Sequence, residues 1–585
     1  RSPSRGLGDV YKRQVKARLK RLRHYLDEQK VHAFYGLLSD PHLSEYVPDY
    51  YKFVSALTGF TGSNAKVLVT KTDVYLWTDS RYWEQASIEC ATLGITLMKE
   101  GVEETLNVAD LLKTLFGGKT IRVATALHMT PSRIYEAFMD DGIEVFNFTD
   151  DLIDDVWPER PTLSAHEIWI HHGSAHRAKE RLLALQKRVQ DASRDNPGYL
   201  VLNKLDQIAW LTALRGSDIA FNPFFLSRAL VSTDSAELFV ASPSITDEVI
   251  AHLNQAGWQL FEYAAFKTRL KQLQSATVLY NPLELSAELA CVITNNSHIK
   301  ATSFDHGIDL AKAVKTPEEI QGLREVAKMD SRTIDAFIAD VRTRLQHGEA
   351  LTEYDLSVIL HEHRARNPGF ITESFETIAA IDANAARPHY APTKEKATKV
   401  KLPCVLLLDS GAQYDKGTTD ITRVWLLGET SEVAAHTLSE LKADYRAVFN
   451  AMTALQNARF KPGTCGFELD SIARNEVKVR GIDYGHSTGH GIGLTLGVHE
   501  APPSISPRET PASKTPFMPG MVVSDEPGIY RPGQWGIRLE NMLLCVEKED
   551  GMLGFEVLTD CGFDDRLLNC LLYTSPSPRD GLLSR

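Results

Sequence analysis

The sequence has 585 residues, of which 43% are hydrophobic and 24% are charged, and its formal net charge at pH 7 is −12. This length predicts two to four globular domains, the negative charge argues against nucleic acid as the main partner, and no apolar run approaches the roughly 18 residues of a membrane span. The N-terminus lacks an apolar signal-peptide core, and the seven cysteines include no CxxC pair. We therefore expect a cytoplasmic protein with reduced thiols and no nucleic-acid or membrane partner.

Local patterns divide the chain into three domains, flanked by two terminal segments that we expect to be non-native. Leu19, Leu22 and Leu26 predict an opening helix, and two prolines in Pro158–Pro161 mark a linker. At Thr316–Glu319 a capping box with proline at the first helical position starts the third domain. The expected segments are a non-native leader (1–14), mixed α/β domains at 15–160 and 161–315, a third domain at 316–569 and a non-native tail (570–585).

Shorter elements are predicted inside the first two domains. Apolar runs at 67–69 and 74–77 read as strands separated by a turn, and a third run at 199–202 reads as another strand. Between them, residues 174–192 place leucine and valine on one face at helical spacing.

A first pair of acids, Asp409 and Asp420, flanks a turn-like stretch in the third domain. An apolar run leads into Asp409, and an alternating run follows Asp420. If the hairpin is symmetric about Tyr414 and Asp415, the two acids stand opposite each other on one face, with Cβ atoms about 5 Å apart. Carboxylates placed in this way can share a metal ion.

A second pair of acids, Glu526 and Glu540, has its midpoint at Gly533, inside a Pro-Gly turn. A glycine-rich loop, 485–493, separates the two pairs and contains His490. For one hairpin alone, ordinary surface acids remain an alternative. Acid opposite acid is destabilising without compensation, and here it would occur twice, so the combined pattern predicts a cation site.

Motifs across nearly the whole chain resemble those of the pita-bread metallopeptidases of the Xaa-Pro aminopeptidase P family (M24B type). In the third domain they are Asp409–Tyr414, Gly417–Arg423, Gly489–Gly493, Val498–Glu500, Asp525–Gly528 and Gly536–Asn541; in the first, Asp40–Tyr46, Thr58–Ser63 and Trp77–Tyr82; in the second, Leu214–Asp218 and Asn222–Pro223. The resemblance implies an α/β (α+β) fold in which two creatinase-like N-terminal domains (15–160 and 161–315) precede a pita-bread catalytic domain (316–569).

The resemblance also implies a centre of two divalent metal ions. Its five ligands would be Asp409, Asp420, His490, Glu526 and Glu540. One imidazole and four carboxylates form a hard, oxygen-rich set, which suits Mn²⁺ better than a thiolate-seeking ion. Two adjacent ions can produce a bridging hydroxide nucleophile near neutral pH, and Glu526 would also move the proton to the leaving nitrogen.

Five further residues match family positions around the substrate. His389, His486 and His499 are expected to be catalytic, as hydrogen-bond donors to the scissile carbonyl or the oxyanion. Arg538 and Tyr530 are expected to bind substrate. For a lone histidine a packing or surface role is the alternative, and a surface arginine and a packing tyrosine are the alternatives for the other two.

The predicted function is release of the N-terminal residue from peptides with proline in second position, by a homodimer. A bond before proline is a tertiary amide without an N–H donor, so a dedicated enzyme is useful. The alternatives are a prolidase that cleaves Xaa-Pro dipeptides, a catalytically inactive pita-bread module that binds peptides, and a creatinase-like hydrolase without metals. The three-domain length favours the aminopeptidase, and the presence of all five ligand residues counts against inactivity.

Overall fold

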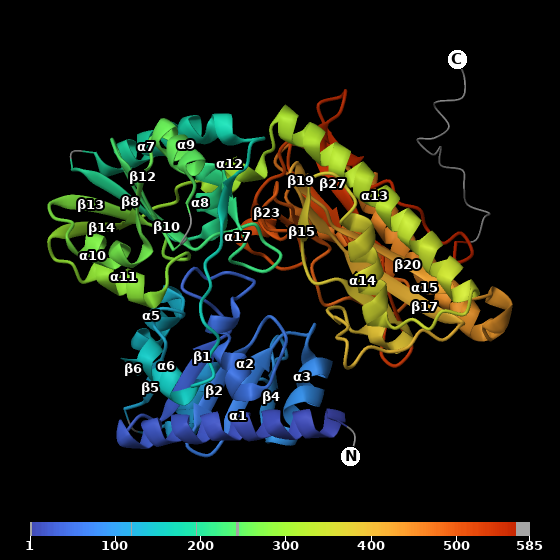
Figure 1. Ribbon diagram of the computed structural model, residues 1–585, viewed down its shortest axis with the longest axis horizontal. Coiled ribbons are helices and arrows are strands. Elements are labelled where there is room, and N and C mark those ends of the chain that lie inside the picture. The colour runs from blue at the N-terminus through green and yellow to red at the C-terminus, as the bar shows by residue number, and fades with distance from the viewer. Residues whose placement is uncertain (1–2, 119, 195, 242–244, 569–585) are drawn as a thin grey trace. The chain divides into compact units, whose positions relative to one another are not determined.

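The computed structural model describes residues 3–118, 120–194, 196–241 and 245–568, without the side chains of residues 3–10. The chain forms two compact units, Arg1–Ile308 and Asp309–Arg585. Chain-order colour separates them in Figure 1, where the first runs from blue to green and the second from yellow-green to red. The first unit contains two six-stranded sheets, one in each of the two stretches expected to form N-terminal domains.

The first sheet is mixed and packs helices on both faces. Its strand order is β4 (Thr96–Lys99), β3 (Val74–Thr78), β2 (Lys66–Thr70), β1 (Ala33–Leu37), β5 (Arg122–Thr125) and β6 (Glu144–Asn147). Val67 and Val69 pack with the predicted leucines of helix α1 (Pro3–Glu28), whereas Leu68 packs with α4 (Val108–Phe116) on the other face. This alternation follows from the two-residue period of a strand.

The second sheet repeats the order and the strand directions of the first. It runs β12 (Gln259–Glu262), β11 (Ala236–Val240), β10 (Ser227–Ser232), β8 (Gly198–Leu202), β13 (Ala276–Tyr280) and β14 (Ile299–Ser303). In both sheets the central strand has an antiparallel neighbour on one side and a parallel neighbour on the other.

The remaining elements of this unit connect or cover these sheets. They are α2 (Phe53–Thr58), α3 (Trp83–Cys90), α5 (Ser132–Asp140), α6 (Asp150–Val156), α7 (Ala178–Ser193), α8 (Leu205–Thr212), α9 (Asp247–Ala256), α10 (Phe266–Lys271), α11 (Ala287–Thr294), β7 (Ile168–Ile170) and β9 (Leu214–Gly216). The strands predicted at 67–69, 74–77 and 199–202 and the helix predicted at 174–192 are confirmed.

The second unit opens on α12 (Ile308–Ala313) and the long helix α13 (Pro317–Gln346), which begins with the predicted capping box. Together with α14 (Glu353–Arg364), α13 covers one face of a three-stranded sheet of β16 (Ile378–Ile381), β17 (Cys404–Ser410) and β20 (Ile421–Leu427) (Figure 1). Leu406 and Leu408 face these helices, and Val405 and Leu407 face α15 (Ala435–Gln456). Residues 404–408 of β17 are all apolar because both faces of that strand are buried.

Two further sheets and a hairpin complete the second unit. One sheet has the order β15 (Phe370–Glu373), β18 (Ala412–Tyr414) and β19 (Gly417–Thr418), and the other β21 (Arg459–Phe460), β28 (Leu553–Val557), β27 (Asn541–Glu547), β24 (Val522–Asp525), β22 (Gly489–Gly491) and β23 (Glu500–Ile505). The hairpin pairs β25 (Gly528–Arg531) with β26 (Trp535–Arg538), and the last helices are α16 (Gly466–Lys478) and α17 (Pro511–Lys514).

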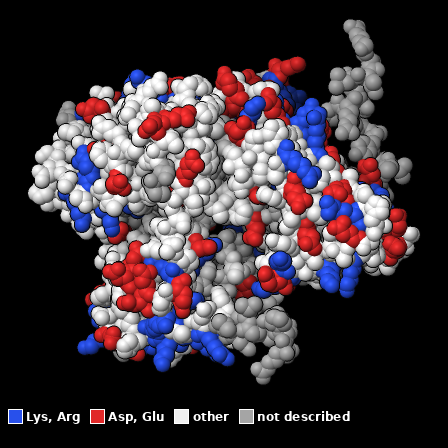
Figure 2. All heavy atoms as spheres, in the orientation of Figure 1, with Lys and Arg blue, Asp and Glu red and all other residues white. Residues whose placement is uncertain are grey.

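Within the described part of the chain, no helix combines the length and the apolar character that crossing a membrane requires. On the face shown in Figure 2, acidic and basic side chains are interspersed over both units. Helix α1 includes most of the segment 1–14 that we expected to be a non-native leader, and the expected tail at 570–585 lies outside the described residues.

Candidate metal centre

The first predicted hairpin forms, but its register differs from the prediction. Asp409 pairs with Thr422, and the ladder continues beyond a break with Tyr414 opposite Gly417. The turn therefore lies at 415–416, and Asp420 stands diagonal to Asp409 on the same face. The predicted direct opposition of Asp409 and Asp420 is wrong by two residues.

A close approach to helix α13 explains this turn. Gly417 pairs inside the ladder, and a Cβ added to it would lie 2.7 Å from Leu323 Cδ2. Glycine is thus used here for close packing rather than for a left-handed turn conformation. Symmetry of the sequence about the turn cannot reveal this contact.

The second hairpin has the predicted register. Asp525 pairs with Asn541 in one ladder and Gly528 pairs with Arg538 in the next, so both ladders share the same centre at Gly533. Glu526 and Glu540 occupy opposing positions between the two ladders, as expected.

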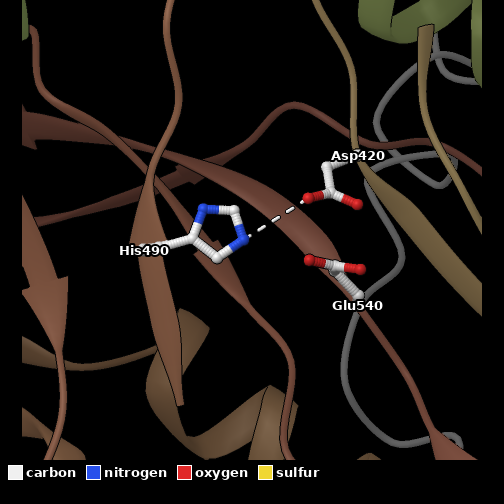
Figure 3. A group of neighbouring side chains, drawn as sticks. All are labelled: Asp420, His490 and Glu540. Atoms are coloured by element: carbon white, nitrogen blue, oxygen red, sulfur yellow. Dashed lines mark ion pairs between the residues drawn. The ribbon is translucent and has the colours of Figure 1, made fainter. Parts of the chain in front are cut away.

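Three predicted ligands converge in the second unit. One possible ligand atom from each of Asp420, His490 and Glu540 lies within 4.8 Å of the others. Figure 3 shows the two carboxylates and the imidazole pointing toward one another from different segments. His490 Nε2 also lies 3.4 Å from Glu526 Oε1, the same distance as from Asp420 Oδ2.

The hydrogen bond on the far side of the His490 ring sets its tautomer. His490 Nδ1 lies 3.0 Å from the carbonyl oxygen of Gly491, and a carbonyl can only accept, so Nδ1 holds the proton. Nε2 then faces the acids. Metal-binding histidines are commonly oriented in this way by a carbonyl on the other nitrogen.

Arg538 joins Asp409 to two other predicted site residues. Its Nη2 donates to Asp409 Oδ2 at 2.6 Å and its Nη1 donates to the Tyr530 hydroxyl at 2.7 Å. The Tyr530 hydroxyl lies 2.7 Å from His486 Nε2, and His486 Nδ1 lies 2.8 Å from the carbonyl oxygen of Ser487. Because a carbonyl oxygen can only accept, His486 Nδ1 carries a proton and donates to Ser487.

The other two predicted histidines lie at the margins of this cluster. The ring of His499, an exposed residue, packs edge-on against His490 with centroids 4.3 Å apart. His389 is half-buried, and the residue before it, Pro388, accepts a 3.2 Å hydrogen bond from Arg538 Nη2 at its carbonyl oxygen.

Burial and neighbouring charges shift the pKa values of the proposed ligands. Burial raises the pKa of Asp409 despite the opposing charge of Arg538, and raises the pKa of Glu540, with the charge of Asp420 adding to the effect. Desolvation raises the pKa of Glu526 to about 7. Burial opposes protonation of His490, but the adjacent Asp420 and Glu526 outweigh it and raise the pKa to about 9.

The donor set fits divalent cations. Among the five proposed ligands, three buried carboxylate oxygens have no hydrogen-bond partner in the described residues: Asp409 Oδ1, Asp420 Oδ1 and Glu540 Oε1. A buried carboxylate needs a proton, a donor or a cation. Oxygen-rich ligands with one imidazole match Mn²⁺-like ions, and a cation would satisfy these oxygens and relieve their mutual repulsion.

Residues without an assigned role in the sequence support these ligands. The Thr422 hydroxyl donates to Glu540 Oε2 at 2.6 Å, and the Ser524 hydroxyl accepts from the backbone N–H of His490 at 3.0 Å. Both follow the period-two pattern of their strands, which places them on the face of a predicted ligand. That pattern was available in the sequence as a signal for them.

Comparisons with known proteins decide the family. The sequence matches the profile of Metallopeptidase family M24 over residues 321–547, and that of the Creatinase/Prolidase N-terminal domain over 18–154 and 159–319. A probable Xaa-Pro aminopeptidase P of Aspergillus fumigatus is 32% identical over 566 residues, covering 93% of this chain and 84% of that protein. The chain belongs to metallopeptidase family M24, in its Xaa-Pro aminopeptidase P group.

Other relatives agree with this membership. Aminopeptidase P2 of Arabidopsis thaliana is 33% identical, covering 89% of this chain and 77% of that protein. The solved X-prolyl aminopeptidase of Caenorhabditis elegans, described as a cytosolic enzyme with a di-nuclear active site, has a TM-score of 0.86 at 26% identity and covers 94% of this chain and 92% of its own. An Xaa-Pro dipeptidase of Bacillus anthracis has a TM-score of 0.52 at 25% identity, and the match covers 67% of this chain and 99% of that chain. The predicted fold class is confirmed.

Proposed function

We propose that this metallopeptidase hydrolyses the bond between an N-terminal residue and a following proline. Two divalent metal ions would be held by Asp409, Asp420, His490, Glu526 and Glu540. The observation that supports this most is the convergence of Asp420, His490 and Glu540, in which one buried oxygen of each carboxylate has no hydrogen-bond partner among the described residues.

Mn²⁺ is the ion we propose, because four carboxylates and one imidazole form a hard ligand set. When bound, such ions supply polarisation of the scissile carbonyl and a lowered pKa of water. Hydrolysis adds the water oxygen to the carbonyl carbon and breaks the C–N bond. Glu526 would take the proton of the water and deliver it to the leaving proline nitrogen.

The surrounding residues would orient the substrate and its developing charge. His499 projects its exposed ring beside His490, where it can donate to the substrate carbonyl. Arg538 donates to the carbonyl oxygen of Pro388, the residue before His389. His389 would therefore act from the same side of the site as Arg538. His486 would act through the Tyr530 hydroxyl, which it binds at 2.7 Å.

Matches to aminopeptidases over nearly the whole chain support peptides rather than dipeptides as substrates. The Bacillus anthracis dipeptidase corresponds to 67% of this chain, whereas the Caenorhabditis elegans X-prolyl aminopeptidase corresponds to 94%. A prolidase is the second candidate, since the Bacillus anthracis dipeptidase matches 67% of this chain.

Peptide hydrolysis after metal exchange tests this function. The full chain would be stripped with a chelator, reloaded separately with Mn²⁺, Co²⁺ or Zn²⁺, and given an Xaa-Pro-Yaa tripeptide, an Xaa-Pro dipeptide and an Xaa-Ala-Yaa control. We expect metal-dependent release of Xaa from the first peptide, with the highest activity in Mn²⁺. Strict preference for the dipeptide would instead indicate a prolidase, and a folded protein that binds no metal and cleaves nothing would indicate an inactive binding module.

Assembly, location and boundaries are proposals of the same kind. We propose a homodimer in the cytoplasm, following the family resemblance and the cytosolic description of the Caenorhabditis elegans enzyme. We also propose domain boundaries near residues 160 and 315 and non-native ends at 1–14 and 570–585. Light scattering tests the dimer, and an independent read of the coding DNA tests the ends.

A further inference from the structure

Asp420 differs from the other buried acids of the site in how its carboxylate is held. The carboxylates of Asp409 and Glu540 each accept a 2.6 Å hydrogen bond from a side chain outside the proposed ligand set. The Asp420 carboxylate contacts His490 at 3.4 Å, and its Oδ1 has no hydrogen-bond partner in the described residues. Because His490 is itself a proposed ligand, the position of Asp420 depends on its backbone.

Thr419, which precedes Asp420, has every polar atom fixed. Its N–H donates to the Ala412 carbonyl at 2.8 Å, and its carbonyl accepts from the Ser374 hydroxyl at 2.9 Å. Its hydroxyl accepts from the Ala412 N–H at 3.0 Å and donates to Asp330 Oδ2 at 2.7 Å. The residue next to Asp420 therefore has one well-defined orientation.

Asp330, on α13, belongs to a fully buried ion pair. Arg364, at the end of α14, donates to both of its carboxylate oxygens, at 2.9 and 2.8 Å, and neither side chain is exposed. The Tyr414 hydroxyl donates to the other oxygen, Oδ1, at 2.8 Å. A buried ion pair is poor evidence of added stability, because its desolvation cost offsets its attraction, so this pair invites a functional explanation.

The backbone around Thr419 leaves no room for adjustment. A Cβ added to Gly411 would lie 1.9 Å from the Thr419 carbonyl oxygen and 2.2 Å from the Ser374 hydroxyl oxygen. The Gly411 carbonyl in turn accepts from Arg364 Nη1 at 3.0 Å. The same ion pair therefore holds both strands at the point where they leave the first ladder and Asp420 enters the site.

We propose that Asp330, held by Arg364, is a positioning residue that sets the orientation of Asp420 for metal binding through the Thr419 hydroxyl. This inference rests on the proposed metal centre. Thr419 and Tyr414 both donate a hydroxyl hydrogen bond to the Asp330 carboxylate. Only Thr419 is joined directly to Asp420, because Tyr414 lies across the hairpin, so the inference predicts different effects for the two residues.

Metal binding to matched variants tests the inference. Mn²⁺ would be titrated calorimetrically into the metal-free full chain and into Thr419→Val, Thr419→Ser and Tyr414→Phe, with thermal unfolding of each metal-free protein recorded in parallel. We expect Thr419→Val to weaken Mn²⁺ binding by about tenfold or more, the order expected when a hydrogen bond to a charged group is lost. Thr419→Ser keeps the hydroxyl and Tyr414→Phe removes the other donor, so both should stay within about threefold of the parent.

The outcomes separate this inference from the proposed function. Unchanged Mn²⁺ binding in Thr419→Val, or equal weakening in Tyr414→Phe, would overturn the positioning role and leave the metal centre standing. A parent protein that binds no divalent ion would overturn both. If Thr419→Val does not fold, Thr419→Ala replaces it under the same criterion.

Discussion

Glu526 and Glu540 oppose each other where the two ladders of the second hairpin are interrupted. There the Glu526 N–H donates to the Thr488 carbonyl at 2.8 Å, and the Glu540 N–H donates to the Thr422 carbonyl at 3.1 Å. Thr488 lies in the loop of His490, and Thr422 lies in the strand after Asp420. These two backbone hydrogen bonds thus connect the second hairpin to the loop of His490 and to the strand after Asp420.

Replacing Arg538 by lysine should impair the reaction more than the fold. Lysine keeps a charge but cannot contact both Asp409 and Tyr530 with a fixed fork of donors. We expect kcat/KM to fall by roughly 10- to 100-fold, the equivalent of about 1.4 to 2.7 kcal/mol. Steady-state hydrolysis of an Xaa-Pro-Yaa peptide measures it.

An exposed arginine on α13 provides the control for this variant. Arg324 donates to both carboxylate oxygens of Glu556, in a pair that is substantially exposed. Arg324→Lys should leave kcat/KM unchanged, because exposed pairs contribute little. Equal losses in the two variants would refute the role of Arg538.

Tyr530→Phe should slow turnover without unfolding the protein. The change removes the hydroxyl that joins Arg538 Nη1 to His486 Nε2, both at 2.7 Å. We expect kcat to fall about tenfold, the effect of about one lost hydrogen bond, with a smaller change in KM. A selective rise of KM at constant kcat would show that Tyr530 acts in ground-state binding instead.

Stability of the first unit should decrease in mild acid because of His42. Burial, with the charge of Arg228, lowers the pKa of His42 to about 3, and its Nε2 lies 2.8 Å from the Tyr263 hydroxyl. The unfolded chain, with an ordinary histidine pKa, therefore binds more protons below about pH 6.5. The free energy of unfolding should fall as pH decreases below that value, by up to about 1.4 kcal/mol per pH unit.

Denaturant unfolding at pH 7, 6 and 5, followed by a probe in the first unit, measures this effect. His42→Gln cannot titrate, so its free energy of unfolding should fall less steeply with decreasing pH. Parallel curves for the two proteins would contradict the assignment.

Removal of metal should destabilise the second unit. A ligand that binds only the folded state at 100 times its Kd stabilises that state by about 2.7 kcal/mol. We expect calorimetry to show a lower Tm for the second unit after chelation, with recovery on addition of Mn²⁺. If chelation lowered only the Tm of the first unit, the cation would bind outside the proposed metal centre.

The sequence could predict those parts of the fold that depend on neighbours along the chain. The capping box at Thr316, the helix at 174–192 and the register of the second hairpin were all accessible, because each follows from local spacing or turn chemistry. The second hairpin is centred on Gly533, whose positive φ of 73° suits glycine in a turn.

Contacts between distant residues set the features that the sequence could not reveal. The turn of the first hairpin shifts because Gly417 packs on Leu323 of α13. The Arg364–Asp330 pair joins residues 34 positions apart, and Asp330 reaches Thr419 across 89 positions. A buried arginine or aspartate has no local pattern that identifies its partner.

The central claim is that the five predicted residues bind metal ions that the hydrolysis requires. Metal content measured by mass spectrometry on the folded full chain and on Asp420→Ala, with Xaa-Pro-Yaa hydrolysis on the same samples, tests it most directly. We predict two divalent ions per parent chain, fewer in Asp420→Ala, and loss of activity in that variant by at least about 100-fold. Equal metal content and equal activity in the two proteins would contradict the account.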